Sequence, residues 1–308
     1  ASPMTRFAAD ALANEGMALL QEQRFEEAVE RFDGAIRVFP QHAAAWKGLG
    51  QARLCLGQRD AAAGAFDRAI GLGANGATAL WGGAVAHAEL GHKVIAQNYL
   101  RRALELQPSW LEMARGNPAL AAFLELSWHA QALIRKQLGA YSARTYQHAG
   151  GNRSLELARV GNSPVSGQST YISIGLCNHL WPQQERPRME LMLCSIVDDE
   201  RCAQIIANTA FHVMDSGFFP EPGAMLRDVV GVLGGGDWSR QLPHGYITVP
   251  RAWKLRLPLD IGPPPISVAQ LVPVSEAEYQ LWRDKGPREL DLVLGGCNVA
   301  DLSRPSAI

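Results

Sequence analysis

The sequence predicts a multidomain protein of two fold classes, an all-α helical repeat array followed by an α+β domain. The first observation is internal similarity, because the arrangement of small and apolar residues over 50–70 returns 34 residues later, over 84–104. The second is a change of pattern after about residue 140, where helical spacing gives way to alternating apolar runs. With 308 residues, 47% of them hydrophobic, the chain can bury about two cores of ordinary size.

The charge and cysteine content argue against several classes of partner. The 29 basic and 30 acidic residues nearly cancel, to a net charge of −1, so no overall field favours nucleic acid or an acidic membrane. No apolar run reaches the ~18 residues that a membrane helix needs. The five cysteines form no C-x-x-C pair, which argues against a zinc knuckle or a disulfide framework and favours buried thiols in the cytoplasm.

Three windows of paired helices explain the 34-residue period, and they begin near residues 9, 43 and 77. The first helix of each window carries a small residue at one position, Gly16, Gly50 or Ala84, where a larger side chain would push the partner helix away. The second helix repeats an alanine, a bulky apolar residue and an alanine on one face, at Ala28–Phe32–Ala35, Ala62–Phe66–Ala69 and Ala96–Leu100–Ala103.

Turn residues mark the ends of these helices. Gly57 and Gly91 follow first helices, and Pro40 and Pro108 close second helices. This pattern resembles the tetratricopeptide repeat over residues 9–110, which implies a peptide-binding face on the first helices. Carried over position by position, that face comprises Asn14, Met17, Lys47, Gln51, Leu54, Trp81 and Val85.

The same resemblance bears on the kind of peptide. Some members of the family hold a C-terminal carboxylate with polar residues, whose positions are occupied here by Ala13, Met17, Gly48, Thr78 and Gly82. We therefore expect an apolar groove and no carboxylate clamp. The alternative is that this face packs against the rest of the same chain.

The segments on either side of the repeats are predicted as follows. Residues 1–8 are assigned to a tag remnant and lead-in, because three residues precede Met4. Asn117 as a helix cap and Pro118 as a first helical residue open a further apolar pattern. We expect residues 111–149 to form capping helices and a linker, since an end repeat must cover its apolar face.

Residues 150–308 are predicted to form an α+β domain after a surface loop over 141–168. The expected strands lie at 169–176, 188–197, 244–250, 253–261, 266–272 and 290–296, with helices over 202–217 and after a capping box of Ser275 and Glu278. The runs YISIGL, RMELML, ISVAQLVPVSEAEYQLWRDKG and VADLSRPS resemble the suppressor-of-fused domain in its bacterial form. That resemblance implies a non-catalytic binding module, which in bacteria recurs beside polymorphic toxins as an immunity protein.

Three fragments could suggest catalytic or ligand-binding chemistry, and each lacks a necessary part. Cys177 and His179 would share one face of a strand, but no third group orients the histidine. His212 and Asp215 lie three apart on a helix without a second pair of metal ligands. The glycines around 231–236 precede no G-K-[ST]. We predict no catalytic residue, no metal and no cofactor.

Aromatic and basic loop residues are the candidates for partner contact in the second domain, namely Trp181, Arg186, Trp238 and Arg240. The alternative is that each tryptophan packs under its own loop. Together the patterns favour a bacterial immunity protein that neutralises a cognate toxin domain by direct steric binding. The runner-up is a tetratricopeptide adaptor or chaperone for a secreted or assembling client, and an enzyme based on Cys177 and His179 comes third.

Overall fold

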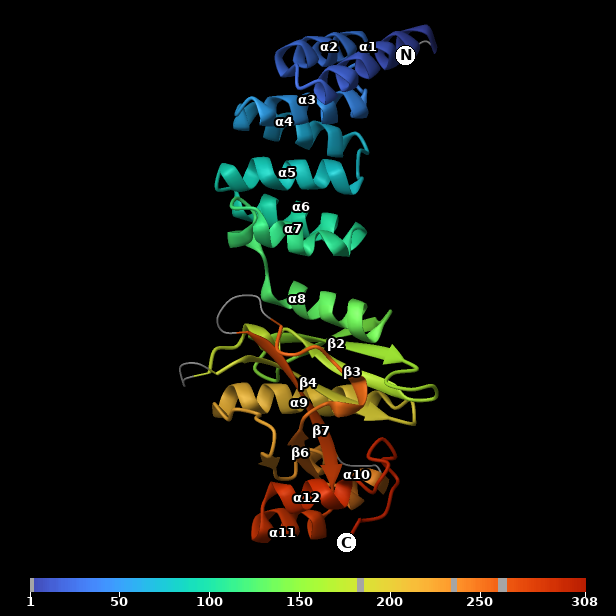
Figure 1. Ribbon diagram of the computed structural model, residues 1–308, viewed down its shortest axis with the longest axis vertical. Helices are drawn as coiled ribbons and strands as arrows, with labels where there is room; N and C mark the ends of the chain where they lie inside the picture. The colour runs from blue at the N-terminus through green and yellow to red at the C-terminus, as the bar shows by residue number, and fades with distance from the viewer. Residues whose placement is uncertain (1–2, 182–185, 234–236, 260–264) are drawn as a thin grey trace. The chain divides into compact units, whose positions relative to one another are not determined.

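The chain folds as two units, Ala1–Glu125 and Leu126–Ile308. A computed structural model describes residues 3–181, 186–233, 237–259 and 265–308 (Figure 1). The first unit contains helices only and the second contains a sheet, which confirms the predicted order of fold classes.

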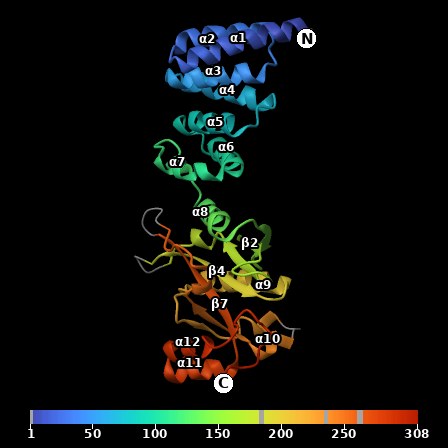
Figure 2. The same cartoon turned by 45° about the vertical axis from the view of Figure 1, so that its right-hand side comes forward.

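Three helical hairpins build the first unit (Figure 2). Their bounds are α1 (Pro3–Gln21) and α2 (Phe25–Val38), α3 (Ala43–Cys55) and α4 (Arg59–Gly71), and α5 (Ala77–Glu89) and α6 (Lys93–Leu106). In the turns of the second and third hairpins, Gly57 and Gly91 have φ values of 72° and 75°. Both glycines end first helices in the left-handed conformation, as the sequence predicts.

Phe32 determines how closely the first two hairpins approach. The ring, in α2, is fully buried. A Cβ atom on Gly16 of α1 would lie 2.8 Å from it, and one on Gly48 of α3 would lie 2.3 Å from it. Because real Cβ atoms do not come so near, glycine is required on both sides of the ring.

Phe66 of α4 repeats this arrangement one hairpin later. A Cβ atom on Gly50 of α3 would lie 3.0 Å from its ring, and one on Gly82 of α5 would lie 2.3 Å from it. The predicted close approach at Gly16 and Gly50 is thus confirmed. The repeat pattern alone assigns no packing role to Gly82.

We expect Gly82→Ala to lower the free energy of unfolding by about 1–2 kcal/mol, because overpacking against Phe66 outweighs the helix propensity gained. Gly64 in α4 is the matched control, since a Cβ atom there meets nothing within 4 Å. Gly64→Ala should raise the same free energy by about 0.5–1 kcal/mol. Denaturant melts of the two variants measure both values, and changes of equal sign would contradict the packing argument.

Three short helices follow the hairpins, η1 (Pro108–Trp110), α7 (Leu111–Gly116) and η2 (Ala121–Phe123). η1 and η2 contact α6, so residues 108–123 cover the last hairpin. The next helix, α8 (Leu126–Leu133), belongs to the second unit, where Leu133 packs with sheet residues. The expected capping segment over 111–149 therefore divides between the two units.

A seven-stranded sheet forms the second unit, in the order β1-β2-β3-β4-β7-β6-β5. The strands are β1 (Ser142–Gln147), β2 (Ser154–Gly161), β3 (Ser169–Ile174), β4 (Arg188–Ser195), β5 (Met225–Leu226), β6 (His244–Thr248) and β7 (Ile266–Val274). β4 and β7 pair in parallel, and the other neighbours pair antiparallel.

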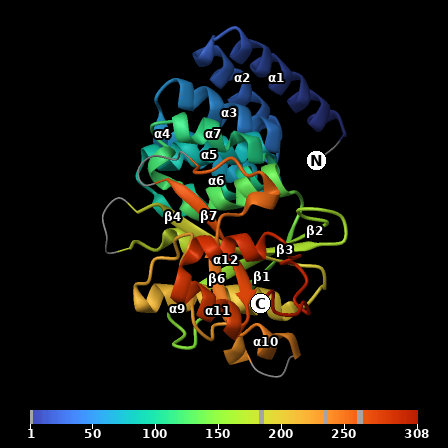
Figure 3. The same ribbon diagram turned by 60° about the horizontal axis from the view of Figure 1, so that its bottom comes forward.

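Helices cover both faces of this sheet. Besides α8, the helices described in this unit are η3 (Ile134–Leu138), η4 (Leu176–Asn178), α9 (Glu200–Ser216), η5 (Gly231–Leu233), α10 (Asp237–Gln241), η6 (Arg251–Trp253), α11 (Glu276–Lys285) and α12 (Pro287–Leu294). Leu157 and Tyr171 pack with α9, whereas their neighbours Ala158 and Ile172 pack with α8 and η3. Successive residues of a strand point to opposite faces, so α9 and α8 lie on opposite sides of the sheet (Figure 1). The last two helices, α11 and α12, face the viewer in Figure 3.

Three predictions for the second unit are wrong. Residues 141–168 contain β1 and β2, and β1 was missed because an edge strand with mostly exposed side chains has little apolar alternation. Residues 290–294 belong to α12, which opens with Pro287 and buries Leu290 and Leu294 four residues apart. The described part of 253–261 forms no strand and makes one bridge, from Leu259 to Ile266.

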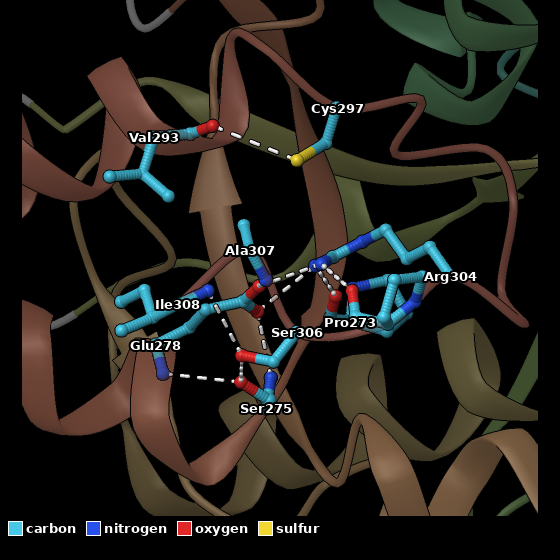
Figure 4. Close-up of polar contacts among 10 residues, drawn as sticks. Pro273, Ser275, Glu278, Val293, Cys297, Arg304, Ser306, Ala307 and Ile308 are labelled. Carbon is cyan, nitrogen blue, oxygen red and sulfur yellow. Dashed lines mark hydrogen bonds and ion pairs between the residues drawn. The ribbon is translucent and has the colours of Figure 1, made fainter.

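An ion pair between Arg304 and Glu278 ties the C-terminal segment into the second unit (Figure 4). Arg304 is 5% exposed and Glu278 is fully buried. Nη1 and Nη2 of Arg304 lie 2.7 and 3.0 Å from the two carboxylate oxygens. Glu278 also accepts the backbone N–H groups of Ser275 and Ala307, both at 2.8 Å. The predicted capping box of Ser275 and Glu278 is thereby confirmed.

These contacts decide the ionisation of Glu278. Burial opposes the charged form, but the hydrogen bonds from Arg304 and the backbone outweigh it and hold the pKa of Glu278 below its usual value. Arg304 also donates to the carbonyl of Pro273 at the end of β7. One buried carboxylate therefore joins β7, the first turn of α11 and the C-terminal segment.

We expect Arg304→Met to cost about 3–5 kcal/mol of stability, because it leaves the Glu278 carboxylate buried without its cationic partner. Arg283 pairs with Asp284 at the surface, with side chains 56% and 60% exposed. Arg283→Met should cost less than about 1 kcal/mol. Urea denaturation measures the free energy of unfolding of both variants. Equal losses would show that the buried ion pair stabilises the fold no more than the surface pair does.

Candidate functional site

The candidate peptide-binding face lies on α1, α3 and α5, the first helix of each hairpin. Met17, Gln51 and Val85 are 34 residues apart and occupy equivalent places on these helices, and Lys47 and Trp81 form a second equivalent pair. α3 contacts both α1 and α5. Because residues four apart share a helix face, the two rows are neighbours.

This face is partly open. Met17 is 40% exposed and Gln51 is exposed, whereas Leu54 and Val85 are half-buried. The ring of Trp81 meets Trp110 of η1 edge to face, with ring centroids 5.4 Å apart. Part of the Trp81 ring therefore packs within its own unit. The other side chains of the two rows are exposed or half-buried.

The packing of the hairpins leaves no room for polar side chains at two of the positions where the family resemblance places a carboxylate clamp. Two of the clamp positions are Gly48 and Gly82. Phe32 and Phe66 fill the space where side chains at these positions would begin, at 2.3 Å. A polar side chain at either position would have to displace a core ring.

Trp181 packs inside the second unit. It is 8% exposed and belongs to the core cluster around α9. Its ring lies 4.5 Å from the His179 ring and 5.4 Å from the Phe219 ring, measured between centroids. Arg186 covers Phe219 at 4.6 Å and pairs with Glu221 at 2.6 Å. Trp181 is therefore part of the core of the second unit and offers a partner little surface.

Trp238 is buried in the same way, at 8% exposure. Its indole N–H donates to Asp199 at 3.4 Å, and the Arg201 guanidinium lies 5.0 Å from the ring centre. Asp199 is the N-cap of α9, so Trp238 braces the start of that helix. Arg240 of α10 is exposed, and of the two α10 candidates it alone offers a partner much surface.

A cavity of about 360 Å³ opens beside β1, β2 and the start of α9. Its charged lining forms two ion pairs, Arg144 with Glu200 and Arg159 with Asp198, the latter at 2.7 Å. The hydroxyl of Tyr171 also donates to Asp198 at 2.9 Å, and this bond, with that from Arg159, lowers the pKa of Asp198. The balanced charges do not favour a phosphate or another strongly charged ligand.

Sequence reasoning missed this cavity for a specific reason. Arg144 and Arg159 lie on β1 and β2, the two strands predicted as a loop. Their shared face becomes visible only through the pairing register, in which Arg144 is opposite Leu157 and Arg159 is opposite Ser142.

Cys177 and His179 do not form a nucleophile and base. The expected shared strand face is wrong, since Cys177 lies in η4 and His179 follows that turn. Burial, and next the Glu190 carboxyl, raise the pKa of the Cys177 thiol, whereas burial lowers the pKa of His179. A reactive cysteine needs a lowered pKa, so the environment of Cys177 opposes nucleophilic chemistry.

Glu190 of β4 is a buried carboxyl group that holds the turn after β3. Its Oε1 accepts the backbone N–H groups of Gly175 at 2.8 Å and Cys177 at 3.2 Å. Its Oε2 contacts the hydroxyl of Ser173. Burial raises the pKa of Glu190 to about 7 despite these hydrogen bonds. The carboxyl group therefore has hydrogen-bond partners within the unit, and we expect its raised pKa to make the turn sensitive to pH.

The residues considered above as metal or phosphate ligands form no such site among the described residues. Asp215 pairs with His148 at 2.8 Å and with Arg153 at 3.2 Å, while His212 is exposed on α9. Within the described ranges, no three His, Cys, Asp or Glu side chains gather as a metal site. Gly231 lies in η5, and residues 234–236 of the glycine-rich run lie outside the described residues. None of the helices among the described residues has the length and apolarity to span a bilayer.

Comparison with known families matches both parts of the chain. Residues 14–77 match the tetratricopeptide repeat family, and residues 151–305 match the family described as suppressor of fused protein (SUFU). The immunity protein YqcF of Bacillus subtilis (strain 168) is 23% identical over 186 residues, which cover 57% of this chain and 95% of that protein.

Solved structures of both kinds are similar at low identity. A SUFU homologue from Neisseria gonorrhoeae FA 1090 is 16% identical with a TM-score of 0.44, over 58% of this chain and 94% of that one. The first TPR of Spaghetti (RPAP3), solved with an HSP90 peptide, is 20% identical with a TM-score of 0.32, over 41% of this chain and 94% of that one.

The buried Glu190 carboxyl predicts a pH dependence of stability. Its pKa is raised above the ordinary 4.5 to about 7, so its stabilising contribution is complete below pH 4.5 and is lost as the pH rises through 7. Relative to Glu190→Gln, the free energy of unfolding should therefore fall by about 3 kcal/mol across this window. Urea melts at intervals between pH 4.5 and 8 measure the difference, and parallel curves would contradict it.

Proposed function

This chain belongs to the suppressor-of-fused protein family, and on that premise we propose that it is an immunity protein that neutralises a cognate toxin domain by direct steric binding. The observation that carries the proposal is the similarity to the immunity protein YqcF, which extends over 95% of that relative. At 23% identity the similarity supports a protein-binding role, and toxin neutralisation is the specific form that we propose.

A steric mechanism needs contact surface and no reacting group. The environment of Cys177, with its raised thiol pKa, is in keeping with this. We propose that the partner contacts the face of α1, α3 and α5 that carries Met17, Lys47, Gln51, Leu54, Trp81 and Val85, together with Arg186 and Arg240 of the second unit. Trp181 and Trp238 would support the contact residues of the second unit from within that unit, since both are 8% exposed.

The proposal also concerns the compartment in which the protein acts. A toxin and its inhibitor act as a toxin–antitoxin pair, and an inhibitor of this kind works where the toxin would act, which we propose is the bacterial cytoplasm. The free cysteines are in keeping with a reducing compartment, because three of the five are buried and none forms a disulfide.

An adaptor or chaperone is the second candidate function, and the tetratricopeptide match over residues 14–77 favours it. In that case α1, α3 and α5 would hold an extended segment of a client protein. The apolar and half-buried side chains of Leu54 and Val85 suit such a segment better than a free carboxylate terminus.

The test is protection from a toxin. Candidate toxin domains, sought first among the genes next to this one, are expressed in a laboratory bacterium with and without the full chain, and growth is measured. We expect full protection by the wild type and by Cys177→Ala, together with a 1:1 complex in size-exclusion chromatography. Loss of protection by Cys177→Ala with the complex intact would support an enzyme instead.

Added bulk on the candidate face should weaken the complex. Gln51→Arg and Val85→Arg each place a long charged side chain there without emptying a core position, so we expect at least about tenfold weaker binding in calorimetric titration. Glu30→Arg, at an exposed site on α2, is the matched control and should change affinity by less than about threefold. Unchanged affinity in both face variants would exclude this face and leave the second unit as the binding surface.

A further inference from the structure

The outer side of β1, the edge strand of the seven-stranded sheet, is open. Among the described strands its one neighbour is β2, and five of its six side chains are exposed. Proteins usually keep an edge from pairing with another chain by means of prolines, lysines or bulges. The strand SARTYQ contains neither proline nor lysine, and its register with β2 is unbroken from Ser142 to Gln147. This edge therefore lacks the common forms of protection.

The pairing register shows which backbone groups of β1 bond to β2. His148 donates its backbone N–H to the carbonyl of Arg153 at 2.9 Å. These two residues lie opposite each other just beyond the ends of the paired strands, so they form a hydrogen-bonded pair. Such pairs alternate along an antiparallel ladder. The residues of β1 that bond to β2 are therefore Tyr146, Arg144 and Ser142.

The other three residues of β1 direct their backbone N–H and C=O groups away from β2. They are Ala143, Thr145 and Gln147. In the described part of the chain, no backbone group outside the β1–β2 ladder bonds to them. A row of alternating donors and acceptors matches the backbone of another extended strand.

We propose that β1 pairs with itself: two copies of the chain join through antiparallel β1 strands about a two-fold axis at Thr145, which continues the sheet from one copy into the other. In this register Thr145 lies opposite Thr145 of the second copy, and Ala143 lies opposite Gln147. Each of these is a hydrogen-bonded pair, so the outward N–H and C=O groups of all three residues find partners.

The side chains of this register are complementary. Between the hydrogen-bonded pairs, Arg144 of each copy lies opposite Tyr146 of the other, with about 4.5 Å between Cα atoms. A guanidinium beside an aromatic ring and two threonines facing each other are both favourable cross-strand contacts. Arg144 keeps its own counter-ion, Glu200. Because Arg144 is the one charged residue of β1, no like charges of the two strands face each other.

The neighbouring registers are less favourable. With the axis at Arg144, the two arginines face each other at the shorter Cα separation, where like charges destabilise a strand pair. With the axis at Tyr146, Ala143 would lie opposite Ala149, which is beyond the end of β1. The axis at Thr145 alone pairs the outward groups of β1 in full and separates the charges. The second copy is thus favoured as occupant by the strand's own sequence.

Self-association of the full chain is measured by analytical ultracentrifugation. The contact involves none of the residues proposed to bind a toxin, so the chain alone is sufficient. A six-residue edge buries much less than the ~1,200–2,000 Å² of a stable interface, so we expect reversible dimers with a dissociation constant on the order of 100 µM. A chain that stays monomeric at about 1 mM, or a Thr145 amide protected from exchange only in a toxin complex, would overturn self-pairing.

Thr145→Pro removes one outward N–H and leaves the bonds to β2 in place, because an edge strand tolerates proline where its N–H faces solvent. We expect dimerisation at least about tenfold weaker, with a thermal melt confirming the fold. Thr145→Val is the matched control, since it keeps the backbone donor, and it should change the dissociation constant by less than about threefold. Equal dimerisation of the proline variant and the wild type would contradict the proposal.

Disulfide capture tests the register itself. Thr145→Cys and Ala143→Cys each place one thiol on the same side of β1, in a background in which Cys55 and Cys297 are replaced by serine and the three remaining cysteines are buried. With the axis at Thr145, the two positions 145 lie about 5.5 Å apart, within the span of a disulfide.

The two positions 143 are four residues out of step, which places them about 14 Å apart at roughly 3.4 Å per residue. Under mild oxidation at a concentration where the wild type dimerises, we expect Thr145→Cys to cross-link at least about tenfold faster than Ala143→Cys. Equal or reversed rates would overturn the pairing, and this result does not depend on the behaviour of the proline variant.

Discussion

A phenylalanine ring held between two glycines is the constraint on which the helical array depends. Phe32 and Phe66 each lie against one glycine of their own hairpin and one of the next, at separations that exclude a Cβ atom at Gly16, Gly48 and Gly82 and leave little room for one at Gly50. The same glycines fix where the first helices lie and remove side chains from two positions of the inner face. Packing therefore constrains the face that we propose for the partner, because the glycines that allow the hairpins to stack leave no room there for two larger side chains.

The second unit depends on buried and half-buried polar groups in an equivalent way. Glu278 with Arg304 fixes the C-terminal segment, Glu190 fixes the turn after β3, and Asp199 fixes Trp238 at the start of α9. Each group satisfies several backbone or side-chain donors, so losing one partner leaves a buried charge or donor unpaired. Trp181 and Trp238, two aromatic side chains predicted to contact a partner, pack in the core of this unit instead.

The sequence predicts the repeats far better than the candidate site. A 34-residue period repeats the same spacing three times, so errors at single positions cancel, and helix ends with glycine and proline add further constraints. The sheet was predicted less well because β1 is a polar edge strand and because a short apolar run such as residues 290–294 fits a helix or a strand equally. The burial of Trp181 and Trp238 depends on contacts with Phe219 and Asp199, residues distant in sequence that no local pattern connects.

The surface charges indicate how a partner would be recognised. Arg144, Arg159 and Arg186 each pair with a carboxylate of the same chain, and the net charge is −1. Such a surface gives little long-range attraction, so electrostatic steering contributes little to the rate of association. A partner must exchange existing ion pairs for new ones, which rewards a matching pattern of both signs more than a large charge of one sign. For the steric inhibitor that we propose, specificity would then come from short-range fit around apolar side chains such as Leu54 and Val85.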